Sequence, residues 1–274
     1  MNRALWIKAI SDARPLLLGL TVLLFAFHWL FVWLTSLFKP DALDTIYKSF
    51  PPQVLALIAV PLAKMMSPAS RIAMAYIDPV VVFAIVTWGI ARGSDAISGE
   101  IGRGTMEMLL AQPLRRVSVI WTHAVVTTAG AAVLSLASWL GTCQGLAGVD
   151  FGERVARARF VPAALNLFAL MFFLAAASTL VSSCGNYRWR TIGVMGAFYL
   201  VELVLKIVAR LAPGYDGLMY ATFLGAYEPQ VMIIEPERAW TMSLSHDGTL
   251  IGLGLLCYLA AAVVFSRRDL PAPL

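Results

Sequence analysis

The chain has 274 residues, of which 59% are hydrophobic and only 14% are charged. A soluble domain carries about 25% charged residues, so this composition excludes most soluble proteins and indicates a chain that lies mainly in lipid. The formal net charge is +5, but the basic residues are scattered between apolar runs, which excludes a concentrated nucleic-acid-binding face.

The first 14 residues, MNRALWIKAISDAR, have an amphipathic pattern. Leu5, Trp6, Ile10 and Ala13 can share one face of a helix, with charged side chains on the other. A tryptophan flanked by cations is typical of a helix that lies on the membrane surface. We therefore expect residues 1–14 to form a cytoplasmic interfacial helix, with a frayed terminus as the alternative.

Six apolar segments follow, each close to the roughly 20 residues that a helix needs to cross a bilayer core. They are Pro15–Phe38, Pro79–Ile90 with an extension from Ile72, Val117–Leu140, Phe160–Val181, Thr191–Val208 and Thr249–Phe265. The last is short and needs flanking residues to complete a span. The sequence predicts an all-α polytopic membrane protein, in which residues 15–274 form one six-helix transmembrane domain.

The connection between the first two spans contains a shorter apolar run, FPPQVLALIAVPLAKMMSP. Pro61 interrupts this run, which is too short to span and predicts an interfacial or re-entrant helix. Asp78 and Pro79 then mark the start of the second span, because a residue before proline is pushed out of helical geometry.

The basic residues predict the orientation of the spans. With the N-terminus inside, segments 1–14, 92–116, 184–190 and 267–274 are cytoplasmic, and they hold 11 Lys or Arg in 54 residues. The outer segments, 38–71, 141–159 and 209–248, hold 9 in 93 residues. This roughly twofold difference in density favours an arrangement with both termini in the cytoplasm.

The longest cytoplasmic connection, residues 94–116, combines charge with a helical pattern, and we call it the coupling segment. Glu100, Arg103 and Glu107 fall on one stripe of a helix, and Ile101, Thr105, Met108 and Leu109 fall on the opposite face. Ion pairs at this spacing contribute about 0.2–0.5 kcal/mol each.

Three glycines in the coupling segment oppose a continuous helix. Gly99, Gly102 and Gly104 each cost about 1 kcal/mol relative to alanine inside a helix, which outweighs the ion pairs. We expect the segment to break into two short helices near Gly102–Gly104, or to become helical only on docking. An apolar face exposed between two spans indicates a docking surface for a soluble partner rather than an ordinary solvated loop.

The coupling segment resembles a motif of ABC-2 type transporter permeases, E…GT-x-E-x-LL-x-x-P-x-x-R. The matching residues are Glu100, Gly104, Thr105, Glu107, Leu109, Leu110, Pro113, Arg115 and Arg116. The closest likeness is to the six-span, single-domain subunits that pair with a separate ATPase. His123 is a departure, since relatives often carry a lysine early in the third span.

The resemblance implies a mechanism in which cytoplasmic coupling helices seat in a groove of an ATPase subunit. It implies apolar contacts from Ile101, Met106, Met108, Leu109 and Leu110, and charge complementarity from Glu100, Arg103 and Glu107. The loop SSCGNYRWR, residues 182–190, is the expected second contact. The implied assembly is two permease copies with two ABC ATPase chains in the cell (inner or plasma) membrane, and its implied activity is export of an unidentified substrate.

The residues themselves also point to a missing ATPase. The chain has no G-x-x-x-x-G-K-[ST] sequence, and GEIGRGTM lacks the lysine that would reach phosphates. ATP and magnesium would then bind to the partner chain, and we expect no cofactor, metal or catalytic residue in this one.

Glu202 and Lys206 stand four residues apart inside the fifth predicted span. Ionisable residues in a span usually face the bundle interior or a cavity, so the pair could lie on a transport pathway or a dimer interface. Alternatively, Lys206 reaches the outer membrane surface and Glu202 pairs with it.

Two other functions stay open at this stage. A membrane-embedded enzyme would need catalytic groups such as a Ser–His pair, yet the three histidines are far apart and no G-x-S-x-G occurs. A secondary transporter would often show inverted repeats, and none is evident. A permease subunit that is not itself an enzyme is the favoured hypothesis.

Overall fold

The computed structural model describes residues 3–37, 67–111, 115–212, 214, 215 and 217–268, and its regular elements are all helices. Six helices are long and apolar enough to cross a membrane, which confirms the predicted all-α polytopic class. They are α1 (Arg3–Leu37), α6 (Pro79–Ser94) together with the helical turns that continue it to Gly102, α9 (Arg116–Gly148), α10 (Val161–Cys184), α11 (Arg188–Leu211) and α14 (Ala239–Arg267). The shorter elements are α5 (Pro68–Ala73), η1 (Met74–Ile77), η2 (Asp95–Gly99), α7 (Glu100–Gly102), α8 (Thr105–Leu110), η3 (Arg157–Phe160), α12 (Leu218–Ala221), η4 (Phe223–Ala226) and α13 (Pro229–Ile234).

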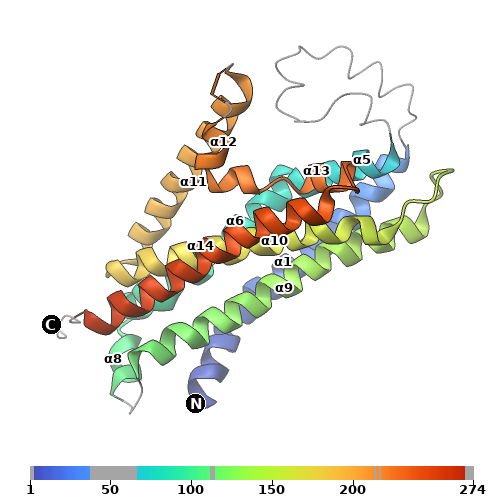
Figure 1. Ribbon diagram of the computed structural model, residues 1–274. Coiled ribbons are helices and arrows are strands. Elements are labelled where there is room, and N and C mark those ends of the chain that lie inside the picture. Colours follow the sequence, from blue (N-terminus) through green and yellow to red (C-terminus); the bar gives the residue numbers. More distant parts are fainter. Residues whose placement is uncertain (1–2, 38–66, 112–114, 213, 216, 269–274) are drawn as a thin grey trace.

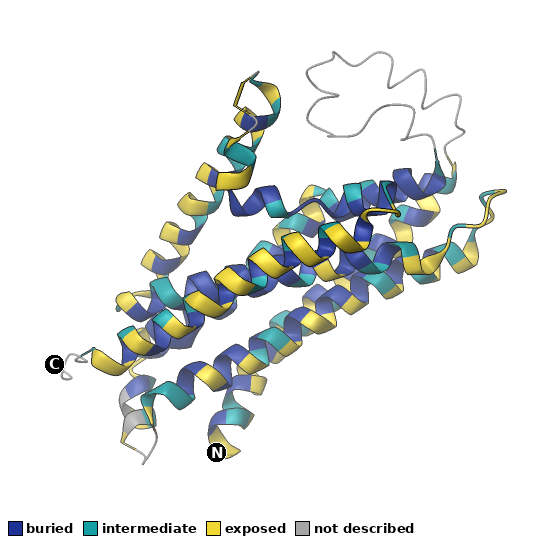
Figure 2. Ribbon diagram, in the orientation of Figure 1, coloured by how far each residue is buried: buried dark blue, intermediate teal, exposed yellow. Residues whose placement is uncertain are grey.

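Helix α10 forms the centre of the bundle. Eighteen of its 24 residues are buried, and it packs against α6, α9, α11 and α14. Its sequence is apolar around the whole circumference, as expected for a helix enclosed by others. Figure 2 shows the contrast with α11, whose surface is mostly exposed. Helix α1 packs along α9 at the other side of the bundle.

Glycines allow two of these helix pairs to approach closely. A Cβ atom at Gly145 of α9 would lie 2.5 Å from the Cβ of Val32 on α1. A Cβ at Gly93 of α6 would lie 2.5 Å from the Cβ of Ser178 on α10. Without a hydrophobic driving force between helices in lipid, such close backbone packing supplies the association energy.

The N-terminal segment is not a separate helix. The structure has one continuous helix from Arg3 to Leu37 with Pro15 inside it, so the predicted boundary at residue 14 is not a break. Leu5 and Ala13 are buried as the amphipathic pattern predicted, whereas Ile10 is 39% exposed. Since Lys8 forms an ion pair with Glu100 of α7, this segment is held against the bundle.

The second span begins where the sequence predicted. Asp78 caps α6 by accepting a hydrogen bond from the backbone N–H of Val80 at 2.9 Å, and Pro79 occupies the first turn. The expected re-entrant helix around Pro61 lies outside the described residues.

The sixth span is longer than predicted, since α14 starts at Ala239 rather than Thr249. Polar residues in the first turns of α14 lower the hydropathy of this stretch, so apolar length alone places the start of the span too late. Asn166 of α10 donates a hydrogen bond to Asp247 at 2.7 Å, and Ser243 donates to the same carboxylate. Because these partners satisfy Asp247, the helix can carry it inside the bundle.

Different helices lie at the two ends of the bundle (Figure 1). The first turns of α1, the end of α14 and α8 lie together at one end, whereas α12 and α13 lie toward the other. The two described chain ends therefore share one side of the molecule, as six spans require. The cytoplasmic location of that side remains a prediction.

Candidate functional site

The coupling segment leaves the second span through an irregular stretch of helix. After Ser94 the helix widens into a π-helical turn, Asp95–Gly99, which places Asp95 and Glu100 in the interior. Turns of this kind are rare and are frequent at functional sites. Helix α7 then ends at Gly102, and Gly104 adopts a positive φ of 70° before α8 begins at Thr105. The predicted break near Gly102–Gly104 is therefore confirmed.

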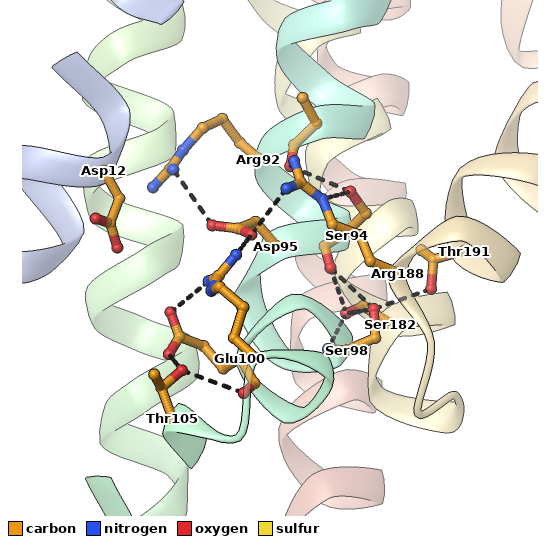
Figure 3. A network of polar contacts seen from close by, with 12 residues as sticks. Asp12, Arg92, Ser94, Asp95, Ser98, Glu100, Thr105, Ser182, Arg188 and Thr191 are labelled. Atoms are coloured by element: carbon orange, nitrogen blue, oxygen red, sulfur yellow. Dashed lines mark hydrogen bonds and ion pairs between the residues drawn. The ribbon is translucent and has the colours of Figure 1, made fainter. Parts of the chain in front are cut away.

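Asp95 is the centre of a charged cluster that joins the second span and its continuation to α11 (Figure 3). Its carboxylate lies 2.6 Å from a guanidinium nitrogen of Arg103, 3.3 Å from Arg188 on α11 and 3.9 Å from Arg92 on α6. The hydrogen bond from Arg103 to Asp95 is the main cause that raises the pKa of Arg103 above its usual range. One buried acid thus holds three arginines, and its position fixes α11 relative to the start of the coupling segment.

Glu100 forms a second centre next to the first. It is fully buried, and it pairs with Lys8 of α1 and with Arg103 at 2.8 Å. Thr105 donates a hydrogen bond to the same carboxylate at 2.5 Å, which ties the first residue of α8 to α7. The predicted Glu100–Arg103 pair is confirmed. Its orientation toward the interior argues against a direct contact of Glu100 with a partner protein.

A hydroxyl cluster completes the connection to the centre of the bundle. Ser182 of α10 accepts a hydrogen bond from the backbone N–H of Ser98 at 2.8 Å, and the hydroxyl of Ser98 lies 3.2 Å from that of Thr191 on α11. Ser182 also donates to the carbonyl of Ser94 at 3.1 Å. The π-helical turn is therefore bound to both α10 and α11. We call the Asp95, Glu100 and hydroxyl clusters together the polar network.

The residues predicted to contact an ATPase divide by exposure. Met108 is 72% exposed and Arg103 is partly exposed, whereas Met106 is buried at 2%. Ile101, Thr105 and Leu109 are half-buried. The side chains of Glu107 and Leu110 and the whole of Pro113 lie outside the described residues. Where the structure describes it, the outward surface of α8 is thus apolar and centred on Met108.

Exposed basic and aromatic residues occur on the segments that follow or adjoin the coupling segment. Arg115 is exposed just before α9, and Arg116 donates a hydrogen bond to the carbonyl of Arg268. Trp189, in the predicted second contact loop, is 67% exposed, and the guanidinium of Arg190 lies 5.3 Å from its ring centre. This loop adjoins the coupling segment, since a Cβ at Gly102 would lie 3.9 Å from the carbonyl oxygen of Asn186.

The sequence argument did not single out several members of the network. Asp95, Arg92 and Lys8 are absent from the predicted site, although each is in or next to an expected cytoplasmic segment, and Arg188 belongs to it only as a member of the loop 182–190. The sequence signal for this cluster is Asp95, an acidic residue three positions after Arg92 at the end of an apolar run. The contacts to α1 and α11, which join Glu100 to Lys8 and Asp95 to Arg188, connect residues about 90 positions apart along the chain, so spacing alone could not identify them.

Three carboxylates of this region converge, but they do not form an open metal site. Asp12, Asp95 and Glu100 offer oxygen atoms within 4.8 Å of one another. Lys8 bridges Asp12 and Glu100, and Arg103 bridges Glu100 and Asp95. These side chains already supply the positive charge that a cation would bring.

Glu202 and Lys206 lie away from this network, near η4 and α13. Among the described residues, Lys206 forms its ion pair with Glu228 at 2.7 Å rather than with Glu202, so the predicted pair is wrong. Glu202 instead accepts a hydrogen bond from the backbone N–H of Phe223 at 3.0 Å. The reason is that the chain returns after α11 and offers Lys206 an acid and two carbonyl oxygens.

Comparison with known proteins agrees with the six-span architecture and the motif. The family model described as "ABC-2 family transporter protein" matches residues 7–270. No curated protein matched the chain. Because the match covers nearly all residues, including every described span and the polar network, this chain belongs to the ABC-2 transporter family as a membrane permease component.

Proposed function

We propose that this chain is the permease subunit of an ATP-driven exporter, and that a separate ABC ATPase docks on α8. Permeases of this family generally pair with an ATPase subunit. The main observation in support is that Met108 of α8 is exposed, while Thr105, the first residue of α8, is hydrogen-bonded to the buried Glu100. A force applied to α8 reaches α1 through Lys8 and α11 through Arg103, Asp95 and Arg188.

The proposed assembly contains two copies of this chain and two ATPase subunits in the cell (inner or plasma) membrane. ATP and magnesium bind to the ATPase, and this chain supplies the pathway. The residues with which we expect the ATPase to make contact are Ile101, Arg103, Thr105, Met108, Leu109, Arg115 and Trp189, with Glu107, Leu110 and Pro113 included from the sequence motif.

The docking surface can be tested by Met108→Asp. Burying an unpaired carboxylate in an apolar interface is costly, so we expect recovery of an ABC ATPase with the tagged chain to fall by at least about tenfold. The measurement is purification from native membranes in mild detergent, with the ATPase identified by its phosphate-binding motif. Tyr220→Asp is the matched control, because Tyr220 is 95% exposed in α12, toward the other end of the bundle. Equal recovery with both variants would contradict docking on α8.

A further inference from the structure

Arg268, the residue that follows the last turn of α14, is bound to a distant part of the chain. Its guanidinium donates hydrogen bonds to the backbone carbonyls of Ser183 at 2.8 Å and Gly185 at 3.0 Å. It also donates to the side-chain oxygen of Asn186. The end of the last span is therefore attached to the loop 182–190, which joins α10 to α11.

These hydrogen bonds fix the end of α10. The helix ends at Cys184, so the carbonyl of Ser183 in its last turn has no partner inside the helix and needs one from outside. A cation is also favoured at the C-terminus of a helix by the helix dipole. A guanidinium presents its donors in one rigid plane, so a single arginine can hold two carbonyls and an amide oxygen together. Arg268 thus sets the direction in which the chain leaves α10.

The same residue connects the loop to the coupling segment at two points. The backbone carbonyl of Arg268 accepts a hydrogen bond from Arg116, which is the last residue of the coupling segment and the first of α9. Asn186, which the guanidinium holds, has its own carbonyl oxygen beside α7, since a Cβ at Gly102 would lie 3.9 Å from it. The position of the loop relative to the coupling segment therefore depends on Arg268.

The neighbouring Arg267 provides a comparison. It is exposed at the end of α14, and its side chain has no hydrogen bond or ion pair with any residue that the structure describes. Two adjacent arginines thus bring the same charge to this end of the bundle, but only Arg268 contacts the loop. A pair of matched substitutions can therefore separate the contact from the charge.

We propose that Arg268 is a positioning residue, which holds the loop 182–190 against the coupling segment in the conformation that the ATPase contacts. The inference rests on the proposed function, in which this loop, with its exposed Trp189, is part of the ATPase contact. The polar network joins the coupling segment to α1, α10 and α11, and Arg268 adds α14 to this set. The hold on the loop itself requires no ATPase, so it can be measured on the purified chain.

Amide hydrogen exchange, measured by mass spectrometry in detergent, reports directly on the loop. In Arg268→Gln, peptides that cover residues 184–192 should exchange about fivefold faster, because the loop loses the donors that hold it. Exchange in the interior of α10 should stay as in the unchanged protein. Arg267→Gln is the matched control, since it removes the same charge one residue away, and it should leave the loop peptides unchanged. Equal exchange in the two variants, or faster exchange throughout α10, would overturn the proposal.

Asn186→Ala tests whether the effect passes through the contact itself, because this substitution removes one acceptor of Arg268. It should also accelerate exchange in the loop. Combined with Arg268→Gln, it should accelerate exchange by less than the product of the two single effects, since both remove the same hydrogen bond. Single effects that multiply would show that Arg268 acts on the loop only through general stability, and would overturn the direct hold.

The link to the ATPase is tested by the purification from native membranes used for Met108→Asp. Recovery of the ATPase should fall by about threefold in Arg268→Gln, as expected when a loosened loop must be ordered on binding, and should be unchanged in Arg267→Gln. Normal recovery despite faster exchange in the loop would overturn the inference and leave docking on α8 standing. Equal recovery with Met108→Asp and its control would contradict the proposed function, and the exchange data would still decide whether Arg268 holds the loop.

Discussion

At the residue scale, the two buried acids of the polar network differ in how many cations depend on them. Each cation at Glu100 has a second acid, because Lys8 also pairs with Asp12 and Arg103 also pairs with Asp95. Arg188 and the buried Arg92 have Asp95 as their acidic partner among the described residues. Asp95 is therefore the harder of the two to replace.

We expect Asp95→Asn to destabilise the protein more than Glu100→Gln. Breaking a buried pair costs about 3–5 kcal/mol, but Arg103 and Arg188 are 43% and 42% exposed, so solvent screening reduces the expected cost to about 2 kcal/mol. This predicts a fall of about 5 °C in the unfolding temperature in detergent, measured by intrinsic fluorescence. Glu100→Gln should fall by less than half as much. The reverse order would show that Glu100 is the principal acid.

At the element scale, the break between α7 and α8 depends on one backbone conformation. Gly104 has a φ of 70°, which disfavours any residue with a Cβ, although a Cβ there would meet nothing within 4 Å. Gly102 is in the last turn of α7 without a positive φ. The two glycines thus compare a strained backbone position with an unstrained one, and neither is crowded.

Gly104→Ala should loosen α8, whereas Gly102→Ala should not. A strain of about 1 kcal/mol corresponds to roughly fivefold faster amide hydrogen exchange in α8, measured by mass spectrometry on the purified chain. Gly102→Ala serves as the control and should leave the exchange unchanged or slower, because alanine favours a helix. Similar exchange in both variants would mean that the positive φ does not hold the break.

The sequence predicted the elements better than their contacts. Apolar length sufficed for the number and order of the spans, and glycine propensity sufficed for the break at Gly102–Gly104. Apolar length did not predict the start of α14, because an acidic residue such as Asp247 is typical of a loop. Only the structure shows that Asn166 donates a hydrogen bond to Asp247 inside the bundle. The network was missed for the same reason. Lys8 and Glu100 are joined by tertiary packing, which no local pattern encodes.

At the scale of the whole molecule, the polar network connects the end that carries α8 to a groove of about 590 Å³ between α6 and α11. The polar network binds α8 to α1, α6 and α11, and α6 and α11 also form the walls of the groove. A change at α8 therefore reaches the groove along the two helices that line it. Docking of an ATPase on α8, as proposed, places the end that carries α8 in the cytoplasm.

That orientation can be tested with cysteine accessibility. Cys184 is exposed next to the loop that adjoins α7, whereas Tyr220 lies in α12 toward the other end. In a chain whose only cysteine is Cys184, a membrane-impermeant maleimide should react in inside-out vesicles and fail to react in intact cells. In a chain whose only cysteine comes from Tyr220→Cys, the pattern should reverse. Because the basic residues predict both termini inside, reaction of Cys184 from the cell exterior would contradict the orientation and, with it, docking of a cytoplasmic ATPase on α8.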